Sequence, residues 1–294
     1  MGRQSVFVTR PGDRGAIPVV ACPLDAGTFA TIASETEWAI ALRHFEICAS
    51  MQMFPPGAFE EALELGCGDG KGSRKLEYWC TRLLATDCDI GKVAVNGTEK
   101  ITFLALDAAG SYPYEAGSFE LVFSSNLLEH LSNAEICLKE CARVLKPGAY
   151  AVHLVPSRTW KVFNLLLFYP VVVRDVLSTK DILEGNNIPE VSQLDDNLRP
   201  TNRVRSCWQR VIPRTHGHSS SHLREFGEWS EKRWLAAFER SGLQVVQIVR
   251  LPFYYGYGFA FPWVLRLGNR LGLSSSTAFV LRKPRVLKSS AEMR

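Results

Sequence analysis

The residues with the clearest chemical use are the glycines of residues 62–73, which read ALELGCGDGKGS. An apolar run breaks there into a glycine loop, and a stretch with helical character follows. Glycine lets a backbone pass close to a ligand or take a positive φ angle, because it has no Cβ. A dinucleotide fingerprint needs glycine at the sixth position counted from Gly66, and that position is Lys71. The segment therefore predicts a loop that binds a small molecule other than a dinucleotide.

Acidic residues end the next two apolar runs, at Asp87 and Asp107. An acidic residue about twenty positions after such a loop can accept hydrogen bonds from the hydroxyls of a ribose. A fourth run, residues 118–125, opens onto the sequence NLLEH, which ends at His130. Alternating strands and helices favour a parallel sheet with helices on both faces. Right-handed crossovers would bring these strand ends together at one edge.

These four segments in series resemble the class I S-adenosylmethionine-dependent methyltransferases, and most closely the type-11-like domains that act on small molecules. The resemblance spans roughly residues 59–157. It implies S-adenosylmethionine as the cofactor, with Glu64 and the glycine backbone at its amino acid part, Asp87 at the ribose, and Asp107 with Ala108 at the adenine. The cofactor-binding residues that it implies are Glu64, Gly66, Cys67, Gly68, Gly70, Asp87, Cys88, Asp107, Ala108 and Asn126.

The same resemblance implies an α/β fold. We expect a doubly wound, Rossmann-like sheet of seven strands, with a cap insertion between strands 5 and 6. From residue 59 the expected order is strand, helix, strand, helix, strand. The expected parts are an irregular lead-in at residues 1–33, a cofactor-binding core at 34–157, a substrate cap at 158–222, the rest of the fold at 223–284, and a tail at 285–294.

Three histidines are candidates for the catalytic base: His130, His216 and His222. Methyltransferases that make ubiquinone or modify small-RNA ends have a similar Glu-x-x-Glu-His stretch that holds a divalent metal. Asn126 stands here in place of the first glutamate, and an amide is a weaker ligand for a hard cation. A closed zinc site at residues 216–222 would want four ligands, and no cysteine pair lies nearby. We therefore expect no metal ion, and histidines without a chemical role remain an open alternative.

Composition limits the remaining choices. The chain has 294 residues, a formal net charge of +4 and 46% hydrophobic residues, which suits a globular protein. Its eight cysteines include no Cys-x-x-Cys pair, so reduced thiols are expected. The start of the chain has no continuous apolar core of a secretory signal, and no run is long enough to span a bilayer. The expected location is the cytoplasm, with peripheral contact to the inner face of a membrane as an extension.

Two segments outside the core could bind an acceptor. Residues 199–214 hold five arginines and no acidic residue, which suits phosphate groups but is also common on a solvated loop. Residues 253–263 are strongly aromatic and precede Arg266 and Arg270. They could enter a membrane interface or cover an apolar substrate.

The combined prediction is an S-adenosylmethionine-dependent methyltransferase. We expect O-methylation of a small-molecule, glycan or lipid-associated acceptor, and nucleic acid is not the expected partner. The alternatives are an RNA methyltransferase, which the arginines favour, and a scaffold that binds S-adenosylmethionine without turnover. A nicotinamide enzyme is a remote third alternative.

Overall fold

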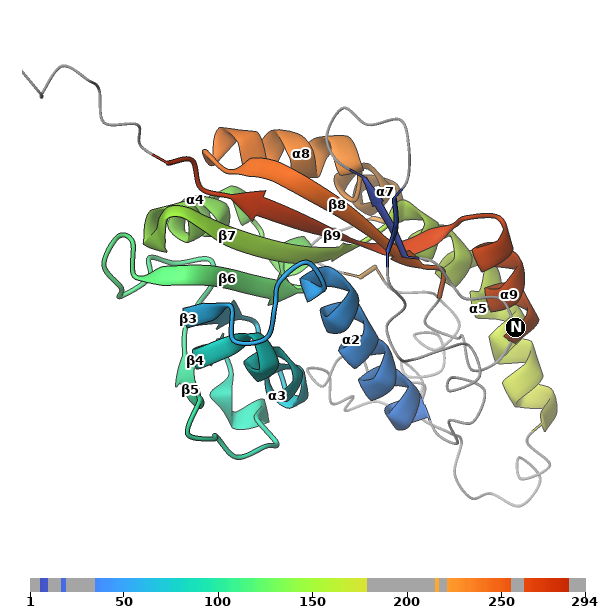
Figure 1. Cartoon of the computed structure of the whole chain (residues 1–294). Coiled ribbons are helices and arrows are strands. Elements are labelled where there is room, and N and C mark those ends of the chain that lie inside the picture. Colours follow the sequence, from blue (N-terminus) through green and yellow to red (C-terminus); the bar gives the residue numbers. More distant parts are fainter. Residues whose placement is uncertain are drawn as a thin grey trace, which may run out of the picture.

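The computed structural model describes residues 6–9, 17–19, 35–178, 215–216, 221–254 and 262–285. Within these residues the strands form one nine-stranded sheet with helices on both faces (Figure 1). The strands are β1 (Val6–Thr9), β2 (Ile17–Val19), β3 (Phe59–Leu65), β4 (Cys80–Asp87), β5 (Ile101–Ala105), β6 (Phe119–Ser125), β7 (Leu145–Pro156), β8 (Gln244–Pro252) and β9 (Ser274–Arg282).

The strand order is β2-β1-β8-β9-β7-β6-β3-β4-β5. The five strands from β7 to β5 in this order are mutually parallel, and β9 runs antiparallel between β7 and β8. The order reverses at β3, since β4 and β5 lie on one side of it and β6 and β7 on the other. Ligands of open α/β sheets bind at such a switch point, outside the carboxyl ends of the strands. The fold thus directs attention to the ends of β3, β4 and β6.

The strands β3 to β9 confirm the expected seven-stranded, Rossmann-like sheet. The expectation of an irregular segment at residues 1–33 was wrong where β1 and β2 lie. β1 pairs antiparallel with the edge of β8, with Val8 opposite Val249, and β2 pairs with β1. Short runs rich in β-branched residues can satisfy the open edge of a sheet, although three or four residues give little periodicity to read.

The helices are α2 (Glu35–Met51), α3 (Lys71–Leu76), α4 (Ala134–Val144), α5 (Arg158–Ser178), α7 (His222–Glu228), α8 (Glu231–Arg240) and α9 (Pro262–Arg270), with short 3₁₀ turns η1 (Glu77–Trp79), η2 (Ile90–Lys92) and η3 (Leu128–His130). The helix expected between the second and third strands of the core was wrong, because only η2 forms there. Asp89 accepts a hydrogen bond from the backbone N of Gly91, which favours a tight turn. None of the described helices is both long and apolar enough to span a membrane.

Two apolar clusters hold the layers together, one on each face of the sheet. Ile47, Met51 and Leu76 join the face that α2 and α3 cover. Leu138 and Phe238 join the opposite face, under α4 and α8. Successive residues of a strand point to opposite faces, so both clusters draw on β3: Ala62 belongs to the first cluster, and Leu63 and Leu65 to the second.

The remaining expectations for the cap fall largely outside the described residues. These include the arginines of residues 199–214 and His218, which belongs to the histidine-rich stretch 216–222. The expected tail after residue 285 also lies outside the described residues. The described parts of the cap are α5, which begins just after β7 and has Pro170 inside it, residues 215–216, and residues 221–222 at the start of α7. The proposed domain boundaries stay predictions.

Candidate functional site

The glycine loop lies at the carboxyl end of β3. Gly66, Gly68 and Gly70 have φ angles of 71°, 54° and 78°, a region that side chains disfavour. A Cβ at Gly66 would come within 3.0 Å of Leu127 Cδ1, and one at Gly70 within 2.7 Å of Val95 Cγ2. A Cβ at Gly68 would meet nothing within 4 Å. Gly66 and Gly70 are therefore needed for packing, whereas Gly68 faces open space that a ligand can use.

The two predicted aspartates meet the loop at this edge of the sheet. Asp87 Oδ2 accepts a hydrogen bond from Gly68 N at 2.9 Å, and Asp87 Oδ1 accepts one from Asp89 N at 2.9 Å. Asp107 lies one strand further, where Leu106 N donates to Asp87 O at 3.0 Å and Asp107 Oδ1 accepts from Ala109 N. A carboxylate has about four lone-pair sites, so each aspartate keeps acceptor capacity for a ligand.

Glu64 is a buried acid beneath the loop, and only 4% of it is exposed. Its Oε2 has no hydrogen-bond partner among the described residues. Burial raises the pKa of Glu64 to about 7, against smaller opposing influences from Ser73 and Arg43. A buried acceptor without a donor is costly, and a cationic donor from a ligand would relieve that cost.

The two cysteines of the predicted set contribute little reactivity. Cys67 N donates to Thr86 O at 2.9 Å, which ties the loop to β4. Burial raises the pKa of the Cys67 thiol to about 12, so the thiol is neutral at physiological pH. Partial burial and the charge of Asp87 also raise the pKa of Cys88. Since the thiolate is the nucleophile, neither side chain is suited to covalent catalysis.

Arg43 on α2 is a site residue that the sequence did not reveal. Its Nη1 donates to Ser125 Oγ at 2.7 Å and to the buried Glu46 Oε2 at 2.8 Å. With the Asn126 amide assigned so that its oxygen faces Arg43, that oxygen accepts from Nη2 at 2.8 Å. Asn126 has a φ of 51°, and its backbone N donates to Leu154 O at 3.0 Å. The amide side chain of Asn126 is thus engaged with α2. Apart from the spacing of Arg43 and Glu46 on one helix, no local pattern predicts this contact.

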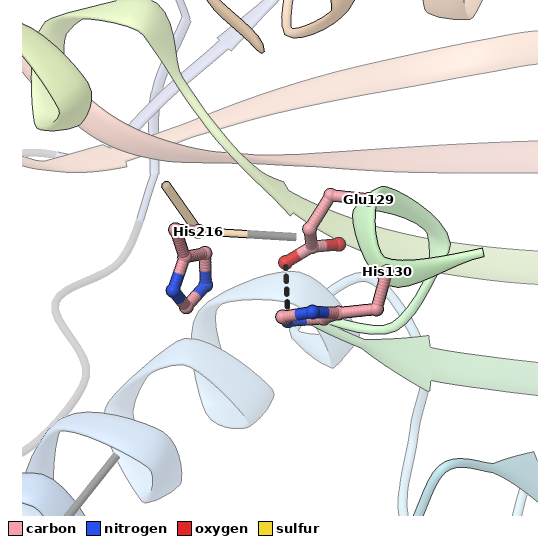
Figure 2. A group of neighbouring side chains, drawn as sticks. All are labelled: Glu129, His130 and His216. Atoms are coloured by element: carbon pink, nitrogen blue, oxygen red, sulfur yellow. Dashed lines mark ion pairs between the residues drawn. The ribbon is translucent and has the colours of Figure 1, made fainter. Parts of the chain in front are cut away.

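Beyond the end of β6, Glu129, His130 and His216 form a compact group, the Glu–His–His group (Figure 2). One donor atom from each residue lies within 4.8 Å of the others, and His130 Nε2 is 4.0 Å from Glu129 Oε1. The Glu129 side chain is fully buried, and neither of its oxygens has a hydrogen-bond partner within the described residues. Burial raises the pKa of Glu129 to about 8.

The ring of His216 is held among aromatic side chains. Its centroid lies 5.0 Å from that of Trp160, 5.7 Å from Trp229 and 4.8 Å from His130. Its backbone N donates to Glu225 Oε1 at 2.6 Å. Burial, aided by neighbouring cationic groups, lowers the pKa of His216 to about 3, so its imidazole is neutral.

Of the three predicted histidines, the structure brings two together. His222 lies apart from the Glu–His–His group, with its Nδ1 3.8 Å from Glu225 Oε2. Glu225 also pairs with the buried Lys161. Glu129 stood in the motif as a neighbour of His130, but the sequence did not identify it as the buried partner of two histidines.

The strand order, the glycine loop and the acidic strand ends together define a class I methyltransferase domain. In agreement, residues 63–153 match the family described as "Methyltransferase domain". This match covers the core strands from β3 to β7.

Relatives and solved structures extend the comparison. The chain is 27% identical to the ubiquinone biosynthesis O-methyltransferase of Maricaulis maris over 111 residues, 36% of this chain and 44% of that protein. It is 25% identical to the demethylmenaquinone methyltransferase of Clavibacter sepedonicus over 170 residues, 55% of this chain and 69% of that protein. The first match thus spans less than half of the relative's length. A Listeria monocytogenes structure described as a candidate S-adenosylmethionine-dependent methyltransferase shares the fold, with TM-score 0.51 and 14% identity over 84% of this chain and 99% of that chain.

Proposed function

We propose that this protein is an S-adenosylmethionine-dependent methyltransferase that methylates a hydroxyl group of a small or lipid-associated molecule. The observation that carries the proposal is the hydrogen bond between Asp87 and the backbone of Gly68. This hydrogen bond joins the glycine loop to Asp87, the acid that we propose binds the ribose, at the edge of the sheet where the strands end. The space next to Gly68 is open. Bound S-adenosylmethionine supplies a methyl group on a sulfonium, which a nucleophile displaces in line, so the chain mainly has to bind, align and exclude water.

The residues fit this cofactor. Gly68 and its neighbours offer close backbone approach, and Asp87 has free lone pairs for the ribose hydroxyls. The unpartnered Oε2 of Glu64 suits the ammonium of the amino acid part. Asp107 and Ala108 would contact the adenine at the next strand end.

The Glu–His–His group is our proposal for the place that receives the acceptor hydroxyl. It follows β6 directly, on the same edge as the glycine loop, and the His130 side chain is 43% exposed. His130 can reach an acceptor hydroxyl and take its proton, and Glu129 lies beside it. His216, which burial keeps neutral, would orient the acceptor by a hydrogen bond. For His222 the proposed role is indirect, through Glu225 and the position of His216.

The same three side chains also fit a divalent cation. Two imidazoles and one carboxylate are a ligand set of catalytic zinc sites, which leave a further position open. The sequence predicted no metal ion partly because Asn126 stands in place of a glutamate ligand. In the structure, the Asn126 side chain faces Arg43. His216 supplies a third donor that no local motif could reveal. Such an ion would act as a Lewis acid on the acceptor oxygen.

The surroundings of the group favour a particular acceptor. Trp160 is half-buried and Trp229 is buried beside His216, so an aromatic wall borders the group. Aromatic faces suit ring-bearing or apolar molecules. Among glycan, lipid and other small acceptors, we therefore propose a hydroxyl on an apolar, ring-bearing acceptor.

An acceptor panel tests the proposal. The full chain would be incubated with S-adenosylmethionine and phenols, quinols, lipid-linked sugars, free sugars or RNA, and release of S-adenosylhomocysteine would be measured, with cofactor binding followed by calorimetry. The proposal expects product with a small hydroxyl acceptor. Product with RNA alone would favour the RNA methyltransferase. Binding without product across the panel would favour the scaffold, and absence of cofactor binding would revive the nicotinamide enzyme.

A further inference from the structure

The helix α9 exposes an apolar stripe to solvent. The exposed fractions are 63% for Trp263, 48% for Leu267 and 66% for Leu271, just after the helix. Steps of four residues place these side chains on one face of a helix. Large apolar side chains that gather on one exposed face, rather than singly, indicate an interaction surface.

This exposure is not the result of a loosely packed helix. A Cβ at Gly268 would overlap the Phe253 ring, so α9 lies directly against that ring. The side chain of Asn269 accepts from Phe253 N at 2.7 Å and donates to Phe253 O at 2.9 Å. Val264 is buried in the same contact. The opposite face of α9 is thus firmly attached, and the stripe is held outward.

The neighbouring helix α5 presents a second apolar stripe. Val162, Leu166 and Tyr169 are 37%, 64% and 51% exposed. Phe163, on another face of α5, packs on Phe253 with ring centroids 4.6 Å apart. α5 and α9 therefore share one small core and lie side by side at one end of the molecule (Figure 1).

Both charged residues of α9 are basic. Arg266 and Arg270 are exposed, and their spacing places them beside the stripe on the helical wheel. Residues 262–273 contain no acidic residue, and neither do residues 158–174. A face of aromatic and aliphatic side chains flanked by arginines is typical of helices that lie in the interface of a bilayer. Tryptophan favours the same depth.

We propose that α9, together with the adjacent stripe of α5, docks the protein on the surface of an anionic lipid bilayer. Trp263, Leu267 and Leu271 enter the headgroup region, and Arg266 and Arg270 pair with lipid phosphates. Trp160, beside His216, is in the first turn of α5, so the docked helix connects the bilayer to the Glu–His–His group. The acceptor would then be an amphiphile taken from the membrane. This last step rests on the proposed methyl transfer, whereas the docking itself does not.

Flotation of the full chain with vesicles tests the docking without any activity readout. The probes are phosphatidylcholine vesicles with and without phosphatidylglycerol, at low and high salt. Wild type should float with the anionic vesicles, and less so at high salt. Trp263→Ser with Leu267→Ser should lower the binding constant at least about tenfold. Arg266→Glu with Arg270→Glu should lower it about fivefold per charge and remove the salt effect.

The matched control is Ile136→Ser, because Ile136 is 44% exposed on α4, away from α5 and α9 in Figure 1. It should float like wild type. If Trp263→Ser with Leu267→Ser does not fold, Leu271→Ser serves in its place. No flotation of wild type, or an equal loss with Ile136→Ser, would overturn the proposal. So would light scattering that shows a dimer dispersed by the stripe variants without vesicle binding, which would assign the face to a second copy of the chain.

Discussion

Asp87 holds the glycine loop by accepting a hydrogen bond from Gly68 N, and we propose that the remaining lone pairs of its carboxylate bind the ribose of the cofactor. Asp87→Ala should therefore lower the affinity for S-adenosylmethionine by about 10- to 100-fold, since hydrogen bonds to charged groups contribute about 1.5–3 kcal/mol. Calorimetric titration measures this loss. The control is Asp89→Ala. The Asp89 carboxylate is exposed at the same edge of the sheet and accepts a hydrogen bond from Gly91 N. Equal losses for both variants would contradict a specific role for Asp87.

Glu64 should make stability depend on pH. Its pKa rises from 4.5 to about 7 on folding, so the folded chain binds the proton more tightly. The stability that this provides is complete below pH 4.5 and is lost as the pH rises to about 7. Between pH 4.5 and 8 the wild type should lose about 3 kcal/mol of unfolding free energy as Glu64 loses its proton, whereas Glu64→Gln has no such proton to lose. The difference between variant and wild type should therefore change by about 3 kcal/mol in favour of the variant over this pH range. Urea unfolding of the cofactor-free proteins checks this, and a difference that stays constant with pH would refute it.

The Glu–His–His group should bind one divalent transition-metal ion per chain. Imidazole nitrogen donors favour Zn²⁺ over Ca²⁺ or Mg²⁺, and a cation would compensate the buried Glu129 carboxylate, whose oxygens have no hydrogen-bond partner among the described residues. Dialysis followed by metal analysis, with thermal unfolding before and after chelation, gives the readout. Glu129→Gln and His216→Asn should each lose the ion, whereas His44→Gln, on α2, should retain it. Absence of metal from wild type, or equal content in all variants, would support the original expectation of none.

At the scale of elements, two neighbouring side chains attach α2 to the rest of the site edge. Arg43 donates to Ser125 Oγ at the end of β6, Glu46 accepts from the Tyr254 hydroxyl, and the two also form an ion pair within the helix. Glu46 is 1% exposed and also accepts a hydrogen bond from Tyr254, so removal of Arg43 leaves a buried charge with reduced compensation. Because the Arg43 side chain is 37% exposed, we discount the cost of Arg43→Met to about 1–3 kcal/mol.

A double-mutant cycle with Glu46→Gln, followed by chemical unfolding, measures this coupling. Arg74→Met is the control, since Arg74 and Glu77 are partly exposed and 3.9 Å apart, and it should cost less than about 0.5 kcal/mol. If Arg43→Met costs no more than Arg74→Met, Arg43 does not contribute to holding α2 at the site edge.

Elements with strong local patterns could be predicted from the sequence. α8 runs from Glu231 to Arg240, and its sequence predicts this helix because Ser230 is a cap residue and the apolar residues recur with helical period. In the structure, Ser230 Oγ accepts from Arg233 N. The end of α4 was less predictable. Lys146, Pro147 and Gly148 predict a turn that ends the helix, but they lie within β7, where the pairing with β6 shifts register. Pairing with a distant strand decided that boundary, and a local turn signal could not show it.

The same division applies to the site. The glycine loop, Asp87 and Asp107 could be predicted because each lies at the end of its own strand, and parallel topology brings such ends together. Arg43 and His216 could not, since Arg43 meets Ser125 across 82 residues of sequence and His216 reaches Glu129 from beyond the core. Such contacts depend on how α2 and α5 pack, and side-chain spacing along the chain does not encode that.

At the scale of the whole molecule, the strand order reverses at β3, and the Glu–His–His group, where we propose that the acceptor binds, lies beyond the end of β6. Figure 1 shows α5 and α9 together at one end of the molecule. The family match at residues 63–153 includes the glycine loop, Asp87, Glu129 and His130, whereas His216, α5 and α9 lie outside it.

The most direct test is a crystal structure of the full chain with S-adenosylhomocysteine. The account predicts the ribose within hydrogen-bond distance of Asp87, the amino acid part beside Glu64 and Gly68, and the sulfur directed toward the Glu–His–His group. A nucleoside bound elsewhere, or a crystal soaked at saturating ligand with the glycine loop empty, would contradict it.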